Sequence, residues 1–241
     1  MDADERTESY EGTRTYSRQW FTTFLRHIDE SVVRREVAFI TRQIGTSKSV
    51  LDLCCGPGRH MAPLAEQGYD VVGLDLDESA LHDARRRAPA SAFIRGDMRR
   101  LPLASSSLDA VLCMWQSFGH FDADTNVAAL AEMARVLRPM GRLLLDVYHR
   151  DFHAARLGER TIERDGARVR EQRSMSNERL RAVLTYEDGS NDVFDWRLYV
   201  PDELAELGSR SGLKLELACA EFEEAKPASA EHARMQLVFS T

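Results

Sequence analysis

The sequence lacks any hydrophobic run that approaches the roughly 20 apolar residues needed to span a bilayer. Residues 1–11 are polar and acidic, and they lack the basic and apolar regions of a secretory signal. Hydrophobic residues nevertheless make up 43% of the chain, which is enough for a full core. We therefore expect a cytoplasmic protein that has no membrane partner.

Cysteine is scarce, with four residues in a chain of 241. Cys54 and Cys55 are neighbours and cannot form an ordinary disulfide with each other, and no cysteine pair has the spacing of a zinc site. The histidines show no metal-ligand spacing either. We expect buried thiols in a reducing compartment and no bound metal.

Positive charge is not in excess. The chain carries 32 lysines and arginines against 39 aspartates and glutamates, which gives a net charge of −7. This balance argues against broad, non-specific nucleic-acid binding, although it leaves room for a local basic site.

The pattern of apolar residues predicts the fold class. Helical spacing runs through residues 17–44 and ends at Gly45. Short apolar runs then alternate with amphipathic stretches. The predicted strands are 50–53, 70–75, 92–95, 108–114 and 142–148, and the predicted helices are 59–67, 78–87 and 125–137. Such alternation indicates βαβ units, and hence a Rossmann-like, doubly wound α/β sheet with helices on both faces.

The alternation breaks after about residue 151. Residues 161–171, 180–187 and 192–200 resemble three antiparallel strands, with turns at 176–178 and 188–190. This β insertion either caps the site or pairs across a homodimer. Its arginines fit a solvated strand face better than a binding surface; they are Arg164, Arg168, Arg170, Arg173, Arg179 and Arg181. A helix from Pro201 and strands at 213–219 and 233–239 complete the sheet.

The sharpest motif is VLDLCCGPGRH at residues 50–60. Gly56 and Gly58 let the backbone turn and let a ligand come close, and the next helix points its N-terminal amides at the same place. Met61 follows where a dinucleotide-binding fingerprint would have a third glycine, which disfavours a pyrophosphate-binding dehydrogenase.

Two acidic residues follow in order. Asp75 ends the second predicted strand, where a carboxylate accepts both ribose hydroxyls of an adenosine; the alternative is that it caps the next helix. Gly96-Asp97-Met98 follows the third strand, where Asp97 can accept from an adenine amino group and Met98 can lie against the ring. Each of these two features is common by itself, but their order along the chain after the glycine loop is a specific signal for a bound adenosine.

Taken together, VLDLCCGPGRH, VVGLDLDESAL, IRGDM, LDAVLCMWQSFGHF and LRPMGRLLLDV resemble the class I S-adenosylmethionine-dependent methyltransferases, closely over residues 50–147. The resemblance implies S-adenosylmethionine as cofactor and a seven-stranded sheet whose last strand is antiparallel. It implies Asp52, Gly56 and Gly58 around the methionine part, Asp75 on the ribose, Asp97 and Met98 at the adenine, and Met114 beside the donor. The full set of cofactor-binding candidates is Tyr16, Trp20, Asp52, Cys54, Gly56, Gly58, Arg59, His60, Asp75, Leu76, Gly96, Asp97, Met98, Met114, Trp115 and Gln116.

Two positions depart from the family pattern. Cys54 stands where many relatives have glycine, and Met140 replaces the first glycine of a Pro-Gly-Gly turn. We expect a small side chain to fit at the first position, and the second lies far from the cofactor.

Within the class, the loop at 115–121 and the β insertion are similar to small-molecule N-methyltransferases, including those that dimethylate amino sugars. That resemblance places His120 near the acceptor amine. An amine must lose its proton before attack, and a histidine with a pKa near neutrality suits this task. His120 is therefore the candidate base, against the alternative of a solvated loop histidine. Tyr148, His149 and His153 are further candidates for the acceptor side.

The aromatic residues of the N-terminal helix have two interpretations. In this class such a segment often closes over the cofactor, and we assign Tyr16 and Trp20 to the pocket. For Phe21 and Phe24 we favour packing on the core. The predicted organisation is a helical lid segment at 1–45, a cofactor-binding core at 46–150, the β insertion at 151–200 and the end of the core sheet at 201–241.

The predicted function is methyl transfer to a nitrogen or oxygen of a small molecule. A macromolecular methyltransferase is the alternative within the class, although no Asn/Asp-Pro-Pro-Tyr motif follows the fourth strand. From other classes, the alternatives are an NAD-dependent oxidoreductase and a protein that binds S-adenosylmethionine without transferring its methyl group.

Overall fold

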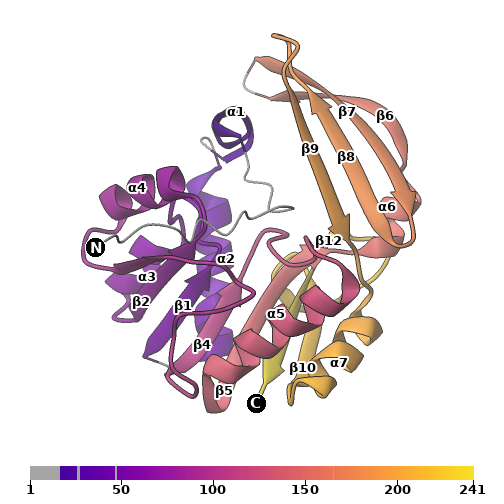
Figure 1. Ribbon diagram of the computed structural model, residues 1–241. Helices are drawn as coiled ribbons and strands as arrows, with labels where there is room; N and C mark the ends of the chain where they lie inside the picture. Colours follow the sequence, from indigo (N-terminus) through magenta and orange to yellow (C-terminus); the bar gives the residue numbers. More distant parts are fainter. Residues whose placement is uncertain (1–16, 26–27, 47, 165) are drawn as a thin grey trace, which may run out of the picture.

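The computed structural model describes residues 17–25, 28–46, 48–164 and 166–241. Its centre is an eight-stranded sheet with the order β11-β10-β12-β5-β4-β1-β2-β3 (Figure 1). The strands are β1 (Ser49–Leu53), β2 (Asp70–Asp75), β3 (Ala92–Arg95), β4 (Leu108–Cys113), β5 (Leu137–Tyr148), β10 (Lys214–Ala220), β11 (Glu223–Pro227) and β12 (Arg234–Ser240).

The pairing of these strands confirms the predicted Rossmann-like class. Strands β1 to β5 pair in parallel with their neighbours, whereas β12 runs antiparallel to β5. The expectation of seven strands is wrong by one, because β11 adds an antiparallel edge strand beside β10. That strand is short and charged, so it carries no apolar alternation from which it could be predicted.

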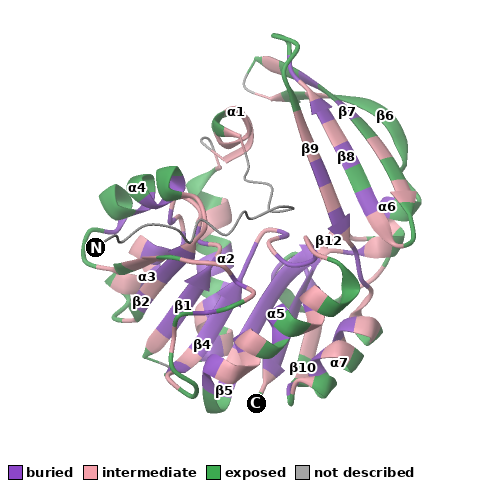
Figure 2. Ribbon diagram, in the orientation of Figure 1, coloured by how far each residue is buried: buried purple, intermediate pink, exposed green. Residues whose placement is uncertain are grey.

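Helices cover both faces of the sheet. Helices α2 (Glu30–Ile44), α3 (Met61–Glu66) and α4 (Glu78–Arg87) lie on one face, and α5 (Ala123–Val136) and α7 (Pro201–Arg210) lie on the other. Alternate strand residues serve the two faces: Leu51 and Leu53 pack with α5, while Val50 packs with α2. Figure 2 shows in purple that the central strands are mostly buried, whereas the edge strands β3 and β11 are half-buried or exposed.

The predicted helical segment at 17–44 is not one helix. It begins with α1 (Arg18–Trp20) and a π-helical turn η1 (Phe21–Leu25), and α2 starts separately at Glu30. Asp29 has extended backbone angles and accepts a hydrogen bond from Ser31 N at 2.6 Å, so it is the N-cap of a new helix. Because α2 has its own N-cap, the aromatic turn η1 does not have to continue along the axis of α2.

A second sheet follows the short helix α6 (Arg150–Ala154). It contains four antiparallel strands in sequence order, β6 (Gly158–Arg164), β7 (Ala167–Ser176), β8 (Arg179–Thr185) and β9 (Asn191–Arg197). The single strand predicted at 161–171 is therefore wrong: it is two strands joined through Gly166, which has a φ of 82°. The predicted turns at 176–178 and 188–190 are present.

The two sheets meet through the N-terminal aromatic turn. Figure 1 shows the second sheet beyond the edge of the main sheet where β5 ends, with α1 between them. Trp20 and Phe24 pack on the apolar face of the second sheet, and the Trp20 ring lies 6.1 Å from that of Phe194. Among the described helices, none combines the length and apolarity that a membrane crossing requires.

Candidate active site

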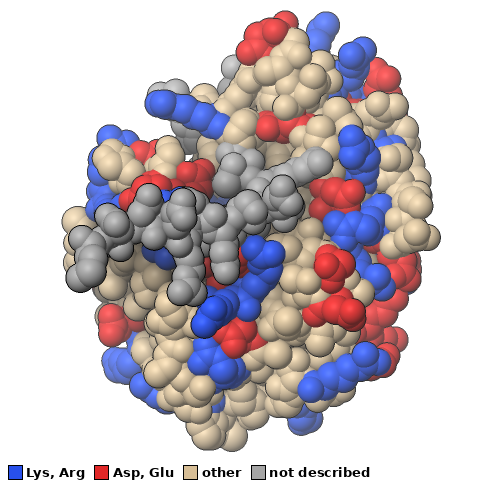
Figure 3. Space-filling model, viewed as in Figure 1, with Lys and Arg blue, Asp and Glu red and all other residues tan. Residues whose placement is uncertain are grey.

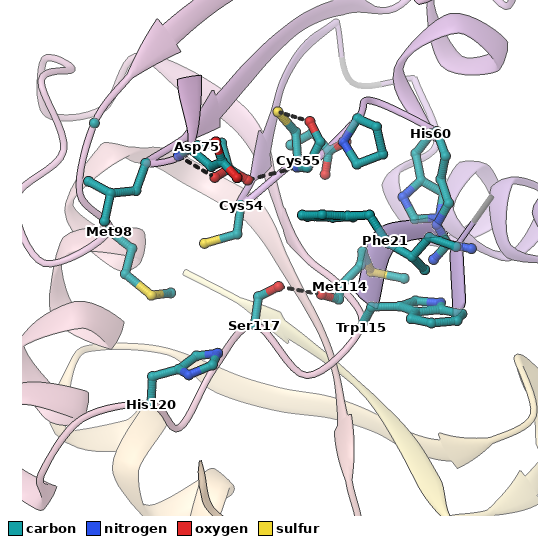
Figure 4. A pocket seen from close by; sticks show the side chains of 18 of the residues that line it. Phe21, Cys54, Cys55, His60, Asp75, Met98, Met114, Trp115, Ser117 and His120 are labelled. Carbon is teal, nitrogen blue, oxygen red and sulfur yellow. Dashed lines mark hydrogen bonds between the residues drawn. The ribbon is translucent and has the colours of Figure 1, made fainter. Parts of the chain in front are cut away.

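A cavity lies at the carboxyl ends of β1, β2 and β4, where the loops of a doubly wound sheet converge. The N-terminal turn contributes to its lining, and Figure 4 shows the Phe21 ring beside the side chains of the strand-end loops. Its lining comprises Trp20, Phe21, Leu25, Asp52, Cys54, Cys55, Gly56, Pro57, Arg59, His60, Asp75, Leu76, Asp77, Gly96, Asp97, Met98, Met114, Trp115, Ser117, His120 and Phe121. The cavity therefore combines the loops after β1, β2, β3 and β4 with a segment far away in the sequence.

The loop after β1 is shaped by left-handed backbone. Cys54, Gly56 and Gly58 have φ angles of 58°, 52° and 71°. A Cβ on Gly58 would lie 2.9 Å from the Cβ of Ala84, so this glycine allows α4 to pack against the loop. Cys54 adopts a conformation that favours glycine, which explains why the family pattern has glycine there, and its side chain lines the cavity.

Asp75 is fixed at the tip of β2 by two backbone amides. Its Oδ2 accepts a hydrogen bond from Gly56 N at 2.7 Å, and its Oδ1 accepts one from Asp77 N at 2.9 Å. Burial raises the pKa of this carboxyl, and the two amides oppose that shift. Asp77, not Asp75, caps α4 by accepting from Ser79 N at 2.8 Å. The carboxylate of Asp75 therefore faces the cavity in a fixed orientation that suits two hydroxyl donors.

The loop after β3 forms a second wall. Gly96, Asp97 and Met98 all line the cavity beside Leu76. The Asp97 carboxylate pairs with the guanidinium of Arg99, whose Nη2 lies 2.6 Å from Asp97 Oδ2. An adenine amino group would share Asp97 with this arginine.

The opposite wall carries buried charge. Asp52 is 2% exposed and its Oδ2 has no hydrogen-bond partner among the described residues. Arg59 and His60 both contact the carboxylate of Glu36, which is 1% exposed. A buried polar atom without a partner is costly, so this end of the cavity fits a ligand that carries its own charges.

The last wall is the loop after β4. In Figure 4, His120 and Ser117 lie across the cavity from Asp75 and Cys54. Burial, together with the positive charge of Arg179, lowers the pKa of His120 to about 4. The expected near-neutral pKa is therefore wrong, and the ring is uncharged at pH 7. A ring N–H of His120 hydrogen-bonds the Gln116 backbone, so its other nitrogen has acceptor character.

The insertion fixes this loop. Arg179 on β8 donates to the carbonyl oxygen of Phe121 at 2.6 Å and to that of His120 at 3.3 Å, and its Nε lies 2.6 Å from Asp195 Oδ1. Arg197 N donates to Gly119 O at 2.8 Å. Arg179 therefore anchors this loop. The prediction that it belongs to a solvated strand face is wrong.

Comparison with known proteins agrees with this geometry. Residues 50–141 match a family model described as a methyltransferase domain. A demethylmenaquinone methyltransferase of Beutenbergia cavernae is 46% identical over 96 residues, which are 40% of this chain and 39% of that protein. A dTDP-3-amino-3,6-dideoxy-alpha-D-glucopyranose N,N-dimethyltransferase of Streptomyces fradiae is 33% identical over 135 residues, 55% of this chain and 52% of that protein. The matches thus span about half, or less, of these relatives.

Residues 50–141 are therefore similar to a methyltransferase domain, and this match covers less than half of the chain. Among solved structures, the sugar N-methyltransferase KedS8 from Streptoalloteichus has a TM-score of 0.71 at 21% identity, and the match covers 100% of this chain and 98% of that one. That likeness shows that the fold is shared over the whole chain, including the second sheet.

The cavity includes most of the cofactor-binding candidates named from the sequence. Gly58 and Gln116 are not among its lining residues. The Gln116 side chain is 3% exposed; it donates to Phe118 O at 3.0 Å and accepts from Tyr148 N, so it stiffens the loop. Tyr16 lies outside the described residues.

Other expectations need correction. Tyr148, His149 and His153 do not line the cavity; the Tyr148 and His153 rings lie 4.4 Å apart, beneath the second sheet. Phe21, which was assigned to the core, lines the cavity instead, and its Cε1 would lie 3.8 Å from a Cβ on Gly56. Helical periodicity indicates which residues lie on the same side of a helix, but it does not indicate whether that side contacts the core or a cavity.

Proposed function

We propose that this protein transfers a methyl group from S-adenosylmethionine to a nitrogen or oxygen of a small molecule. The observation that carries the proposal is one continuous cavity in which the fixed carboxylate of Asp75 and the neutral ring of His120 line facing walls. Asp75 would hold the ribose, Met98 and Leu76 would flank the adenine, and Asp52 would meet the amino acid end. The bound cofactor would supply an activated methyl group.

The apolar side chains between these walls would keep water from the acceptor. Met98, Met114 and Phe21 all line the cavity, and the Ser117 hydroxyl donates to Met114 O at 2.7 Å. A buried acceptor loses contact with water and can be held in line with the methyl group. Such alignment can lower the activation barrier of methyl transfer by several kcal/mol. Phe21 and Trp20 would cover the acceptor after it has entered.

An amine is the acceptor that this geometry favours. A neutral His120 with an acceptor nitrogen can receive an amine N–H and so orient the nitrogen lone pair toward the methyl group. With a pKa of about 4, His120 is poorly suited to retain the proton. We therefore assign His120 an orienting role. The methylated amine then releases its proton to solvent after the transfer. Two of the curated relatives, including the one from Streptomyces fradiae, are named as amino-sugar N,N-dimethyltransferases.

A macromolecular acceptor is less well supported. On the face shown in Figure 3, acidic and basic side chains are interspersed over the described part, and no broad basic field marks a nucleic-acid surface. The N-terminal turn also contributes Trp20, Phe21 and Leu25 to the lining of the cavity.

The test has two stages. Calorimetry should first detect S-adenosylhomocysteine binding; stabilisation by NADH and not by S-adenosylmethionine would overturn the proposal. Release of S-adenosylhomocysteine is then measured with a nucleotide-activated amino sugar and with its matched hydroxyl analogue. Turnover with the amine alone supports N-methylation, and turnover with the hydroxyl analogue supports O-methylation. Turnover restricted to RNA or protein acceptors would contradict a small-molecule function.

Two further features remain proposals. We propose that the outer edge of the second sheet, strand β6, pairs two copies of the chain into a homodimer, which sedimentation would detect as a doubled mass.

We also propose that the four-part division at residues 45, 150 and 200 reflects separable roles, with the lid and insertion serving the acceptor. Cytoplasmic location is likewise an expectation.

A further inference from the structure

One arginine contacts side chains from two different walls of the cavity. Asp97 lies in the loop after β3 and Phe121 in the loop after β4, and both line the cavity. Arg99 contacts each of them, although it is not itself among the lining residues. Its side chain is 32% exposed, so it lies between the cavity wall and solvent. Arg99 is therefore placed to act on a bound ligand through Asp97 and Phe121.

The contact with Asp97 uses three donors of Arg99. Its backbone amide donates to Asp97 Oδ1 at 2.8 Å, and Nε and Nη2 both donate to Oδ2, at 2.9 Å and 2.6 Å. A carboxylate has about four lone-pair sites, so Asp97 can still accept from an adenine amino group. A further donor at this carboxylate would hold it more firmly, and the carboxylate in turn holds the guanidinium through charge-assisted bonds.

The contact with Phe121 is a cation–π contact. The Cζ atom of Arg99 lies over the Phe121 ring, 4.9 Å from its centroid. Such a contact needs a positive charge near the ring and uses no hydrogen-bond donor, so the guanidinium can serve Asp97 and Phe121 at the same time. The position of the ring therefore depends on a group that the adenine side of the cavity holds in place.

The backbone of Phe121 is held by other parts of the fold. Phe121 N donates to Asn126 Oδ1 at 3.3 Å, and Asn126 Nδ2 donates to Phe121 O at 2.9 Å. Arg179 Nη1 donates to the same carbonyl oxygen at 2.6 Å. The backbone of Phe121 is thus bound to α5 and to the second sheet, while its ring reaches the adenine side through Arg99. Since His120 is the preceding residue, the place of this ring shapes the wall that we propose for the acceptor.

A ligand can order a loop only if it binds the ordered state more tightly than the open one. When the loop opens, the Phe121 ring leaves Arg99, and the guanidinium loses one of its two supports. Asp97 is then less well oriented to receive an adenine amino group, because its partner is free to move. Adenine should therefore bind the closed arrangement more tightly, and by reciprocity a bound adenine should favour closure.

We propose that Arg99 couples cofactor binding to the order of the acceptor loop, residues 117–122. An adenine amino group on Asp97 holds Arg99 over Phe121, and the Phe121 ring then completes the wall beside the acceptor. The inference rests on the proposed function, which includes an adenine beside Asp97. Arg99 is a positioning residue, since it acts through these two side chains. The consequence is an order of binding, in which the acceptor side is completed after the cofactor has bound.

Amide hydrogen exchange with two ligands tests this coupling. The ligands are S-adenosylhomocysteine and S-inosylhomocysteine, in which a carbonyl oxygen replaces the adenine amino group. At saturation, both should slow exchange at 114–116, which lie beside the cofactor in the proposed function. S-adenosylhomocysteine alone should also slow exchange at 119–122, by about 5-fold or more, which is the lower end of the coupling between two sites in proteins.

Variants separate this coupling from a merely structural role. In Arg99→Met and in Phe121→Leu, S-adenosylhomocysteine should still slow exchange at 114–116 but no longer at 119–122. Arg99→Lys should keep part of the effect, because a point charge remains without the planar fork. Arg100→Met, which removes the neighbouring exposed arginine, is the matched control and should keep the whole effect. A structural role alone would change exchange in the unliganded protein and leave its response to the ligand as it is.

The outcomes distinguish this coupling from the proposed function. If the wild-type protein binds neither ligand, the proposed function is overturned and the coupling with it. If S-adenosylhomocysteine binds, the coupling alone is overturned by any of three results: no slowing at 119–122, equal slowing by the two ligands, or full slowing in Arg99→Met. Should Arg99→Met bind no ligand, the comparison of the two ligands in the wild-type protein and in Phe121→Leu decides in the same way.

Discussion

Replacement of Asp75 by alanine should cost the protein most of its cofactor affinity. The carboxylate is held by Gly56 N and Asp77 N, at 2.7 Å and 2.9 Å, so it is aligned before a ligand arrives and loses little entropy on binding. Hydrogen bonds to a charged group contribute about 1.5–3 kcal/mol each. Two ribose hydroxyls therefore correspond to about 3–6 kcal/mol, or a dissociation constant raised by roughly 10²- to 10⁴-fold.

A matched control exists at the other end of the same sheet. Asp109 also accepts backbone amides, from Lys48 and Ser49, both at 2.9 Å, and it pairs with Arg138. Asp109→Ala should therefore lower the melting temperature, as Asp75→Ala does, without changing affinity for S-adenosylhomocysteine. Calorimetry of both variants separates ribose binding from loop stability. Equal affinity in the wild-type protein and Asp75→Ala would refute the ribose assignment.

Three further outcomes follow from the same geometry. Burial raises the pKa of Asp52 to about 6, so S-adenosylhomocysteine should bind more weakly as the pH falls through 6, and Asp52→Asn should flatten this dependence in calorimetry. Arg179→Met should speed amide hydrogen exchange in the loop at 117–122, as measured by mass spectrometry, and leave S-adenosylhomocysteine affinity intact; unchanged exchange would contradict the anchoring role. Gly119→Ala should destabilise the fold by several kcal/mol in denaturant unfolding, because its Cβ would lie 2.4 Å from Arg197 O at a φ of 105°.

The core was predictable because its signals are local. Residues 70–75 form β2, as predicted, because a short apolar run lies between two aspartates there. Residues 78–87 form α4, as predicted, because Asp77 provides a cap that helix formers follow. The same locality gave the position of Asp75, because a strand end in a doubly wound sheet defines where its next side chain points. The order of motifs then supplied the family.

Errors arose where the signal was weak or distant. The Asp-Gly pair at 165–166 is a hairpin signal inside a charged stretch, and a single strand over 161–171 does not account for it. The contact between Trp115 and Glu36 joins residues 79 positions apart, and no periodicity in either segment reports it. The low pKa of His120 depends on burial and on Arg179, 59 positions away, so a residue type alone could not give it.

Segments outside the family match help to form the cavity. The family model ends at residue 141, whereas the N-terminal turn and the second sheet, which contact the wall that we propose for the acceptor, both lie outside 50–141. The cofactor side, from Asp52 to Met114, lies inside it. A scaffold can keep its cofactor loops and exchange the segments that meet the acceptor, because those segments attach to the sheet only at strand ends. Acceptor choice should therefore move with residues 17–28 and 158–197, and a chimera that exchanges both segments together, with Arg179 and Asp195 retained, should change acceptor preference while preserving affinity for S-adenosylhomocysteine.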